Sequence, residues 1–502
     1  MSQTDSSNIA SRTISSSFYS LVASAVTLTL GFVRLVLLLY WLLPEDFGVM
    51  AQAMLFVAMA TQLRLPGLDL AIIQRPQLDE PVRRTYFSLR AGLLIISVLL
   101  MAAGTTFIGR AYSTMPLLSN VLLVLLGLDV VKELNTLQEA LMRRELAFRQ
   151  IAIADIVSAI STTLVTPYMA WRGYGVWSLV AEVLVGQISR GAIVWIYGRI
   201  WWPKPGWNRE VASELWQFSN KLWGYALLNF VTDRFDDFWI GRALGSQALG
   251  YYSRAYEAAR YPRRVIAAPL VTVFYSTYAR LQHDKRRLSQ AFFRLTSLMV
   301  RGSFGFSLIF VLLAPELVKL LGETWQPMLA TFQLMIVYTV LDPLVVGVGN
   351  LLIAIGRPDL PFRTRILQVT IFIPTVILLG SKWGIEGVAI AANLMVASGA
   401  LVLFKLTHRF VDYSARRLWL WPTVGLIITC AVILGLNFFW LSLPIWLAFV
   451  LKFGLICLIY GGLLFFVERE EIQWGFQMVF ERLRPFLADI RTYIKSKRGR
   501  KT

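Results

Sequence analysis

Apolar runs of about twenty residues recur along almost the whole chain, and their spacing constrains the fold more than any single motif. An α-helix needs about 20 apolar residues to cross the hydrocarbon core of a bilayer. Of the 502 residues, 56% are hydrophobic and only 16% are charged, whereas soluble domains carry roughly 25% charged residues. We therefore predict an all-α polytopic membrane protein with about fourteen transmembrane helices, at residues 17–42, 47–72, 86–109, 117–140, 150–171, 175–198, 215–240, 249–278, 290–314, 328–355, 361–381, 385–408, 418–441 and 444–467.

The charge pattern of the connections supports this number of spans. Every second connection is rich in Arg and Lys, whereas the alternate connections carry one basic residue or none. Cytoplasmic connections of membrane proteins are basic in this way, so we expect both termini on the cytoplasmic side. The same connections explain much of the formal net charge of +19, and nucleic acid is therefore not an expected partner.

Two stretches about two hundred residues apart resemble each other. The turn LPEDFGVMAQA after the first run aligns with GSQALGYYSRA after the seventh, which places Gly48 opposite Gly250. Further on, GYGV at residues 173–176 aligns with GIEGV at residues 384–388. Each copy has an even number of spans, so both copies run in the same direction and should be related by an axis along the membrane normal. Internal duplication of this kind is typical of transporters.

The repeat also divides the chain into domains. We predict two pseudo-symmetric six-helix lobes, an N-lobe at residues 1–200 and a C-lobe at residues 215–410, joined by a cytoplasmic linker at residues 201–214. Residues 411–467 form the two extra C-terminal helices. Residues 468–502 form a basic cytoplasmic tail, either an amphipathic helix on anionic headgroups or a partly disordered segment.

Arginines inside the predicted spans point to function. A charged side chain near the bilayer centre costs about 2.5–3.5 kcal/mol on insertion scales, so it normally faces protein or water. A water-filled cavity between the lobes would accommodate these charges together, and its cationic lining suits an anionic substrate. The candidate substrate-binding residues are Arg34, Arg64, Arg234, Arg254 and Arg260.

The repeat relates several of these positions to one another. At the offset of 202 residues between the two glycines, Arg34 falls opposite Asp236, with Arg234 two residues away. Arg64 and Arg260 lie on the matching second helices, each two residues before a proline that can bend the helix.

Some of these charges have a structural alternative that stays open. Arg34 and Arg234 could form interior ion pairs with carboxylates. Asp129 and Lys132 lie near a predicted span end and could snorkel to the interface.

Carboxylates in the spans divide into two groups. Glu139 and Asp155 lie near the cytoplasmic side and could balance basic residues close to them in the sequence. Asp342 is harder to explain in that way, and so is Glu182 unless it opposes an arginine. We take Glu182 and Asp342 as candidates for coupling transport to H⁺ or Na⁺.

No enzymatic signature accompanies these charges. The sequence contains no glycine-rich phosphate loop of the P-loop kind, no HExxH and no GxSxG. Cys430 and Cys457 both lie within apolar runs, which supports neither a disulfide framework nor a metal site. We expect a protein that is not an enzyme, with no catalytic residues, metal or cofactor.

Three motifs together resemble a known family. The turn LPEDFGVMAQA, the segment GLDLAIIQRP at residues 67–76 and the segment RRELAFRQIAIADI at residues 143–156 are similar to Wzx-type bacterial polysaccharide flippases. These are lipid-linked oligosaccharide translocases of the multidrug/oligosaccharidyl-lipid/polysaccharide exporter (MOP) superfamily. The resemblance covers roughly residues 15–410 and looks closest to the exopolysaccharide subgroup that includes colanic acid exporters. It assigns no role to any single residue.

The resemblance implies a function. A flippase of this type moves an undecaprenyl-pyrophosphate-linked oligosaccharide from the inner to the outer leaflet of the bacterial plasma (inner) membrane, for exopolysaccharide, O-antigen or capsule synthesis. Its two lobes alternate between inward-open and outward-open states. The implied partners are the lipid-linked substrate, membrane lipids, a polysaccharide polymerase and a chain-length regulator.

Three other functions stay open. The first is a flippase for lipid II or another lipid-linked precursor, which sequence alone distinguishes poorly from an oligosaccharide flippase. A cation-coupled drug exporter of the same superfamily would favour acidic and aromatic cavity residues over arginines. A membrane polysaccharide polymerase or ligase would carry a large outward loop, whereas every predicted outward connection here is short.

Overall fold

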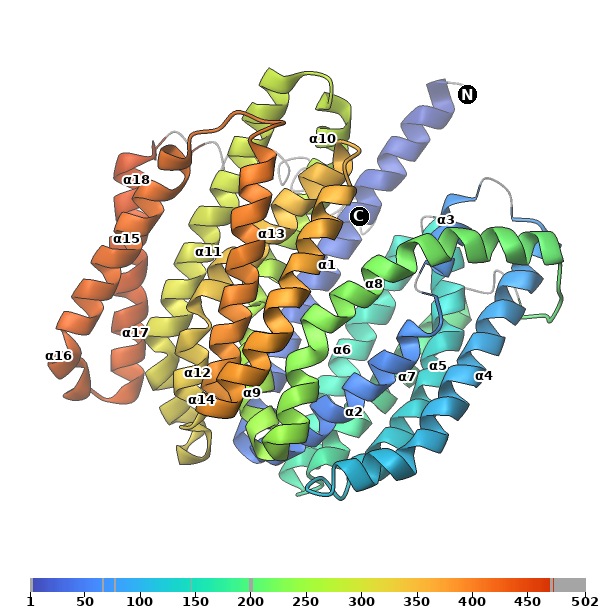
Figure 1. The fold of residues 1–502 in the computed structure, drawn as a ribbon, viewed down its shortest axis with the longest axis horizontal. Helices are drawn as coiled ribbons and strands as arrows, with labels where there is room; N and C mark the ends of the chain where they lie inside the picture. The colour runs from blue at the N-terminus through green and yellow to red at the C-terminus, as the bar shows by residue number, and fades with distance from the viewer. Residues whose placement is uncertain are drawn as a thin grey trace, which may run out of the picture. The chain divides into compact units, whose positions relative to one another are not determined.

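A computed structural model describes residues 3–65, 67–75, 78–145, 147–197, 202–469 and 473. Within these residues every regular element is a helix (Figure 1), which confirms the predicted all-α class. The described helices form two compact units. Unit 1 comprises residues 1–254 with 376–385, and unit 2 comprises residues 255–375 with 386–502.

Long helices make up most of unit 1. They are α1 (Gln3–Trp41), α2 (Pro44–Gln62), α3 (Leu68–Gln74), α4 (Glu80–Ala111), α5 (Leu118–Arg144), α6 (Phe148–Trp171), α7 (Val176–Tyr197), α8 (Arg209–Ala243) and the first residues of α9 (Gly245–Ala259).

Unit 2 contains the rest of α9 and the helices that follow it. They are the π-helix η1 (Arg263–Ala267), α10 (Ala268–Leu281), α11 (Lys285–Leu321), η2 (Glu323–Trp325), α12 (Met328–Leu334), α13 (Ile336–Ala354), most of α14 (Asp359–Thr407), α15 (Ala415–Gly435), α16 (Asn437–Leu441), α17 (Ile445–Ile456), the π-helix η3 (Cys457–Gly461) and α18 (Gly462–Val467).

The protein is a multi-pass membrane protein. Nine helical segments in the described residues are long and apolar enough to cross a membrane: Val22–Trp41, Glu80–Ala111, Phe148–Trp171, Val176–Tyr197, Lys285–Leu321, Ile336–Ala354, Asp359–Thr407, Ala415–Gly435 and Ile445–Val467. One of them, α14, contains two predicted spans that meet at Gly384, where φ is 60° and the backbone leaves the helical region. The remaining predicted spans coincide with α2, α5, α8 and α9–α10, so about fourteen spans are consistent with this fold.

Several predicted spans are divided between elements, and two of these contain candidate arginines. The span predicted at residues 47–72 is broken, because α2 ends at Gln62, Leu65 takes a positive φ of 54° and α3 begins only at Leu68. Arg64 therefore lies in a break between helices. The span predicted at residues 249–278 is also divided, into α9, the π-helix η1 and α10.

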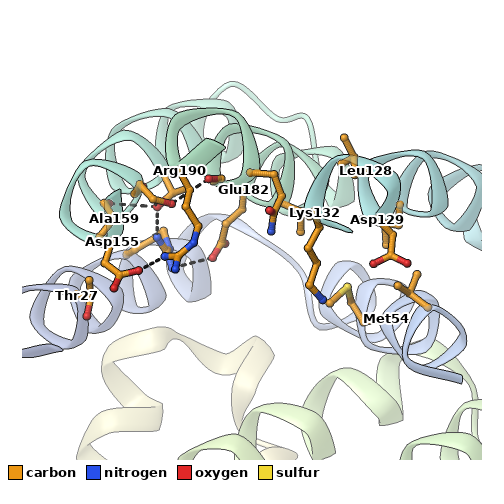
Figure 2. Close-up of a pocket in the computed structure, with 17 residues that line it drawn as sticks. Thr27, Met54, Leu128, Asp129, Lys132, Asp155, Ala159, Glu182 and Arg190 are labelled. Carbon is orange, nitrogen blue, oxygen red and sulfur yellow. Dashed lines mark hydrogen bonds and ion pairs between the residues drawn. The ribbon is translucent and has the colours of Figure 1, made fainter. Parts of the chain in front are cut away.

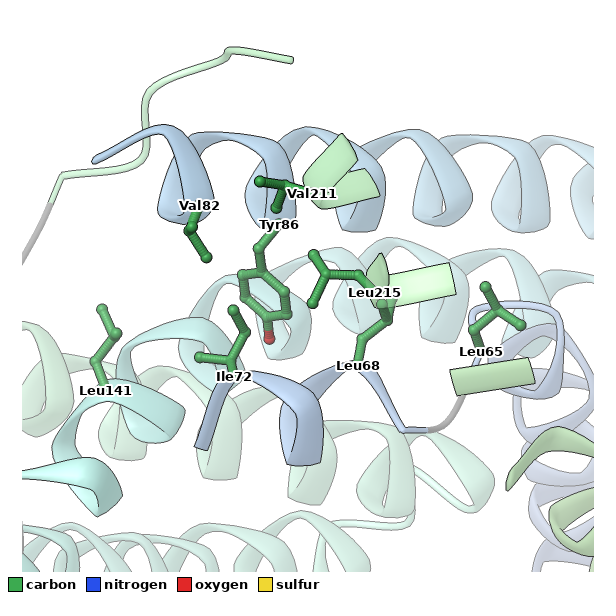
Figure 3. Packing of buried hydrophobic residues seen from close by; sticks show 8 residues of the cluster. All are labelled: Leu65, Leu68, Ile72, Val82, Tyr86, Leu141, Val211 and Leu215. Carbon is green, nitrogen blue, oxygen red and sulfur yellow. The ribbon is translucent and has the colours of Figure 1, made fainter. Parts of the chain in front are cut away.

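An apolar cluster holds α3, α4 and α8 together around Tyr86 (Figure 3). Tyr86 is 2% exposed and packs among Leu68 and Ile72 of α3 and Leu215 of α8. Burying a large apolar side chain contributes about 1.5–3 kcal/mol. This cluster fixes the short helix α3, whose carbonyl groups at Ile72 and Arg75 also accept hydrogen bonds from the guanidinium of Arg144.

The duplicated turns contact each other within unit 1, and their contacts are reciprocal. A Cβ at Gly48 would overlap the carbonyl oxygen of Ser246, and a Cβ at Gly250 would overlap that of Pro44. The repeat offset converts Gly48 into Gly250 and Pro44 into Ser246, so each contact is the image of the other. Close backbone approach requires glycine, which gives a physical reason for the repeated residue.

The starts of α8 and α15 follow the same plan. The amide of Gly206 donates to the Ser88 hydroxyl over 2.9 Å, and the amide of Asp412 donates to the Ser289 hydroxyl over 2.9 Å. Two residues after each of these amides comes the N-cap of the helix, Asn208 for α8 and Ser414 for α15. The structure therefore relates the start of the thirteenth predicted span to that of the seventh, a counterpart that the sequence repeat did not reveal.

Buried ion pairs attach the C-terminal helices to α11 in unit 2. Lys452 of α17 lies 2.6 Å from Glu316, and Arg301 forms a two-pronged ion pair with Glu468, with both N–O distances 2.7 Å. The rest of the predicted tail lies outside the described residues, apart from Arg469 and residue 473. The predicted lobe, linker and tail boundaries stay predictions.

Candidate functional site

A pocket of about 380 Å³ opens among α1, α2, α5, α6 and α7 of unit 1. Figure 2 shows Asp155, Glu182 and Arg190 gathered toward one end, and Lys132 and Asp129 toward the other. The charged lining consists of Arg34, Asp129, Lys132, Asp155, Glu182 and Arg190.

A glycine between two charged residues of α7 leaves part of this space open. Glu182, Gly186 and Arg190 lie four residues apart on α7 and therefore share one face. Gly186 has no side chain to fill the gap between the two charges. Facing it on α6, the Ser158 hydroxyl donates to the Gly186 carbonyl over 3.1 Å, which holds the two helices at close range.

Arg34 and Glu182, predicted separately as a substrate-binding residue and a coupling residue, form one ion pair. The guanidinium of Arg34 lies 2.8 Å from a Glu182 carboxylate oxygen, with the two side chains 19% and 28% exposed. Arg34 also donates to the Thr162 hydroxyl, which donates in turn to the Ser158 carbonyl over 2.8 Å. The interior ion pair considered as an alternative for Arg34 is thus present, and its guanidinium still lines the pocket.

Arg190 holds two carboxylates from two different helices. Its guanidinium donates to both carboxylate oxygens of Glu139, over 2.5 and 3.0 Å, and also contacts Asp155. Two-pronged pairs of this kind are strong and directional. Glu139 and Asp155 therefore have Arg190 as their partner, rather than only the basic residues close to them in sequence.

Lys132 differs from the other lining cations. Its side chain is exposed and lines the pocket, and among the described residues no ion pair or side-chain hydrogen bond is found for it. The ammonium group is therefore available to an anion that enters the pocket.

A second, more deeply buried charge network adjoins the pocket. The Arg64 side chain is 4% exposed and lies 2.5 Å from Asp129 and 3.5 Å from Glu133; its Nε donates to Ser97 over 2.8 Å. Arg90 continues the network by contacting Glu133 and, further on, Asp69 of α3. Because Asp129 also lines the pocket, the two charge groups meet at this carboxylate.

The remaining predicted arginines lie outside the lining of this pocket. Arg234 pairs with Asp237 one turn away, over 3.0 Å. The guanidinium of Arg254 lies 4.9 Å from the ring centroid of Phe47, within cation–π range. Asp236, which the repeat places opposite Arg34, is fully buried and accepts a hydrogen bond from Tyr252 over 2.7 Å.

The other two predicted residues, Arg260 and Asp342, belong to unit 2. The Arg260 guanidinium lies 5.4 Å from the ring centroid of Tyr256. Asp342 of α13 is 3.4 Å from Arg263. The roles assigned to all seven predicted residues stay predictions.

The lining carries equal numbers of opposite charges. Three cations (Arg34, Lys132, Arg190) face three carboxylates (Asp129, Asp155, Glu182), so the formal charge of this lining is zero. An anion would therefore have to displace a carboxylate from its arginine or bind at Lys132. Among the described residues no group of His, Cys, Asp and Glu side chains could hold a metal ion.

Sequence reasoning overlooked Arg90 and Arg190, which organise the two networks. A signal for them was available, because carboxylates in the first six predicted spans outnumber the cations that were considered there. Buried carboxylates are normally paired, so the excess indicates further cations at similar depth.

Comparison with known proteins decides the family. The sequence pattern of the family described as Polysaccharide biosynthesis protein matches residues 37–330, more than half of the chain. The chain belongs to this family.

Relatives within the family agree with the motifs. The lipopolysaccharide biosynthesis protein WzxC of Escherichia coli (strain K12) is 25% identical over 426 residues, 82% of this chain and 84% of that protein. The succinoglycan biosynthesis transport protein ExoT of Rhizobium meliloti (strain 1021) is 27% identical over 315 residues, 61% of this chain and 62% of that protein. The resemblance to Wzx-type polysaccharide flippases of the MOP superfamily is confirmed, and this chain is a transporter of that family, not an enzyme.

Solved structures share the fold. Lipid II flippase MurJ in an inward closed conformation superimposes with a TM-score of 0.74 at 12% identity, covering 91% of this chain and 99% of that chain. An inward-facing multidrug resistance MATE family transporter of the MOP superfamily gives 0.58 at 14% identity, covering 78% and 97%. At these identities the likeness concerns the fold alone.

Proposed function

We propose that this family member translocates an undecaprenyl-pyrophosphate-linked oligosaccharide from the inner to the outer leaflet of the bacterial plasma membrane. The relatives named for lipopolysaccharide and succinoglycan biosynthesis support a lipid-linked sugar as substrate. In this proposal the oligosaccharide feeds exopolysaccharide, O-antigen or capsule synthesis, with a polymerase and a chain-length regulator as downstream partners. The proposal includes a cytoplasmic location for both termini, which the basic connections support.

The observation that carries this proposal is the Arg34–Glu182 ion pair in the lining of a pocket between membrane-spanning helices. A guanidinium matches the geometry of phosphate oxygens as well as that of carboxylates. We therefore assign to Arg34 an exchange of counter-ions, in which a substrate phosphate replaces Glu182. Lys132, which has no ion pair among the described residues, supplies a further positive charge to the arriving anion.

Exchange at Arg34 provides a route to ion coupling. Once displaced from Arg34, the Glu182 carboxylate would lose the charge contact that Arg34 provides between membrane-spanning helices, which favours uptake of H⁺ or Na⁺ at this carboxylate. Uptake of a cation at Glu182 would thus accompany binding of the substrate at Arg34. Asp342 of unit 2 is the second candidate for this role.

The membrane potential favours the proposed direction. If the pyrophosphate crosses with about two net negative charges, a potential that is negative inside assists its outward movement by about 4–5 kcal/mol, at roughly 2.3 kcal/mol per charge per 100 mV. Alternating access of the two lobes would then expose the bound phosphate first to the cytoplasm and afterwards to the outside.

A deletion strain tests the proposed substrate class. Cells lacking the protein should accumulate an undecaprenyl-pyrophosphate-linked oligosaccharide, detected by mass spectrometry of extracted lipids, and re-expression should remove it. Accumulation of lipid II in its place would instead support the peptidoglycan precursor as substrate. Unchanged levels of every lipid-linked sugar would contradict the proposal.

A further inference from the structure

Two basic segments far apart in the sequence meet in unit 2. The first turns of α11 and the segment before α15 together line a cavity of about 520 Å³. We call it the basic pocket; its charged residues are Lys285, Arg286, Arg294, Asp412 and Arg417. Four cations face one carboxylate, which gives a formal charge of +3.

Specific contacts hold the two segments together. Lys285 lies 2.8 Å from Asp412, whose backbone amide donates to the buried Ser289 hydroxyl over 2.9 Å. The hydroxyl of Ser414 accepts from the amide of Arg417 and so fixes the start of α15. The pocket therefore has a defined backbone frame.

Two of the four cations have no carboxylate partner among the described residues and can bind an anion. Among the described residues no ion pair is found for the guanidinium groups of Arg286 and Arg417, and both side chains are exposed. The one carboxylate in the lining, Asp412, is already paired with Lys285. The basic pocket can therefore accept an anion at two arginines without displacing a carboxylate, whereas both arginines that line the pocket of unit 1 are paired with carboxylates.

The corresponding place in unit 1 differs from the basic pocket in its charge pairing and its packing. At the corresponding start of α4, Arg84 is paired with Glu80 over 3.0 Å. Gly206, which corresponds to Asp412, packs so closely that a Cβ there would lie 2.8 Å from the Cβ of Arg84. The space is thus filled in unit 1 and open in unit 2.

The pocket lies near the ends of helices that are able to span a membrane, where lipid headgroups are expected. The first turns of α11 and α15 line it, and each of these helices is able to span a membrane. Phe293 and Tyr413 also line it, and aromatic residues with basic neighbours are typical of the membrane–water interface. The charge pattern of the sequence assigns both basic segments to the cytoplasmic side.

We propose that the basic pocket binds the phosphate of an anionic glycerophospholipid of the cytoplasmic leaflet. Arg286 and Arg417 donate charge-assisted hydrogen bonds to the phosphate oxygens, while the acyl chains lie along the apolar surfaces of α11 and α15. Basic pockets between membrane-spanning helices bind anionic headgroups in this way. This inference does not depend on which sugar lipid is transported.

Native mass spectrometry of the full-length protein in nanodiscs provides the test, with phosphatidylglycerol as the probe and phosphatidylcholine as the neutral comparison. The double variant Arg286→Gln, Arg417→Gln should lower the fraction that retains phosphatidylglycerol by about tenfold or more, since each lost charged hydrogen bond is worth roughly 1.5–3 kcal/mol. The double variant Arg409→Gln, Arg416→Gln removes the same charge from one of the same basic segments outside the pocket lining and should leave retention unchanged.

Four outcomes would overturn the inference. An equal loss of phosphatidylglycerol from both double variants would mean that the lipid is held by unspecific charge attraction. Equal retention of phosphatidylglycerol and phosphatidylcholine by the wild type would mean that the pocket does not distinguish an anionic from a neutral headgroup. Retention of undecaprenyl phosphate without phosphatidylglycerol, or full displacement of the lipid by glycerol phosphate at equal concentration, would assign the pocket to another phosphate source.

Discussion

The guanidinium of Arg34 and the carboxylate of Glu182 lie 2.8 Å apart, although they belong to the first and the seventh helix of the chain. Sequence patterns assigned these two residues to different tasks, substrate binding and ion coupling. Their contact joins the two proposed tasks in one ion pair, since the proposed function has a substrate phosphate replace Glu182 at Arg34.

The buried network around Arg64 should dominate the stability of unit 1. Arg64→Ala leaves Asp129 without its arginine in a site where both side chains are at most 4% exposed, and loss of one partner of a buried pair costs about 3–5 kcal/mol. Arg84→Ala breaks a pair whose side chains are 41% and 43% exposed, so it should cost about 1 kcal/mol or less. Thermal unfolding in detergent compares the two variants. Equal midpoints would contradict this assignment.

The reciprocal glycine contact should not tolerate a methyl group. Gly48→Ala or Gly250→Ala places a Cβ on a backbone carbonyl that cannot rotate away, so α2 and α9 must separate. We expect lower yields of folded protein and reduced export for each variant. Gly92→Ala and Gly127→Ala are matched controls, because a Cβ at either position has open space around it and alanine favours a helix by about 1 kcal/mol. Export at wild-type level in the Gly48 variant would refute the contact.

Lys132 should affect transport without affecting stability. Lys132→Gln removes no ion pair that the described residues form, so its unfolding temperature should match that of the wild type. Loss of a cation from the pocket should lower the rate of export by about tenfold, the effect of roughly 1.4 kcal/mol. Lys204→Gln is the control, since Lys204 is exposed in the segment before α8. A normal export rate in the Lys132 variant would exclude it from the path of the substrate.

The class of fold and the repeat could be predicted from sequence because both depend on local patterns. Apolar runs locate the long helices, and the recurrence of Gly48 at Gly250 marks a backbone contact that only glycine permits. Breaks inside helices were harder to predict. The proline after Leu65 indicated a bend near Arg64, but the separate helix α3 and its packing against Tyr86 are tertiary features that the local pattern did not reveal.

The charge partners could not be predicted in detail because they join residues distant in sequence. Arg190 reaches Glu139 across 51 positions, and neither residue occupies a motif. A count of charges in the spans indicates that partners must exist, but only the helix arrangement selects them. The basic pocket illustrates the same limit, since its two segments are each recognisable as basic while their meeting through Asp412 and Ser289 is tertiary.

The most direct test of the central claim compares Arg34→Ala with the double variant Arg34→Ala, Glu182→Gln. The double variant removes both charges of the ion pair, so it should be closer to the wild type in stability than Arg34→Ala is. We predict that it still fails to export, and that the lipid-linked oligosaccharide accumulates as in the deletion strain, because no arginine remains to bind the phosphate. Restored export in the double variant would show that Arg34 serves only to neutralise Glu182, and would contradict the account.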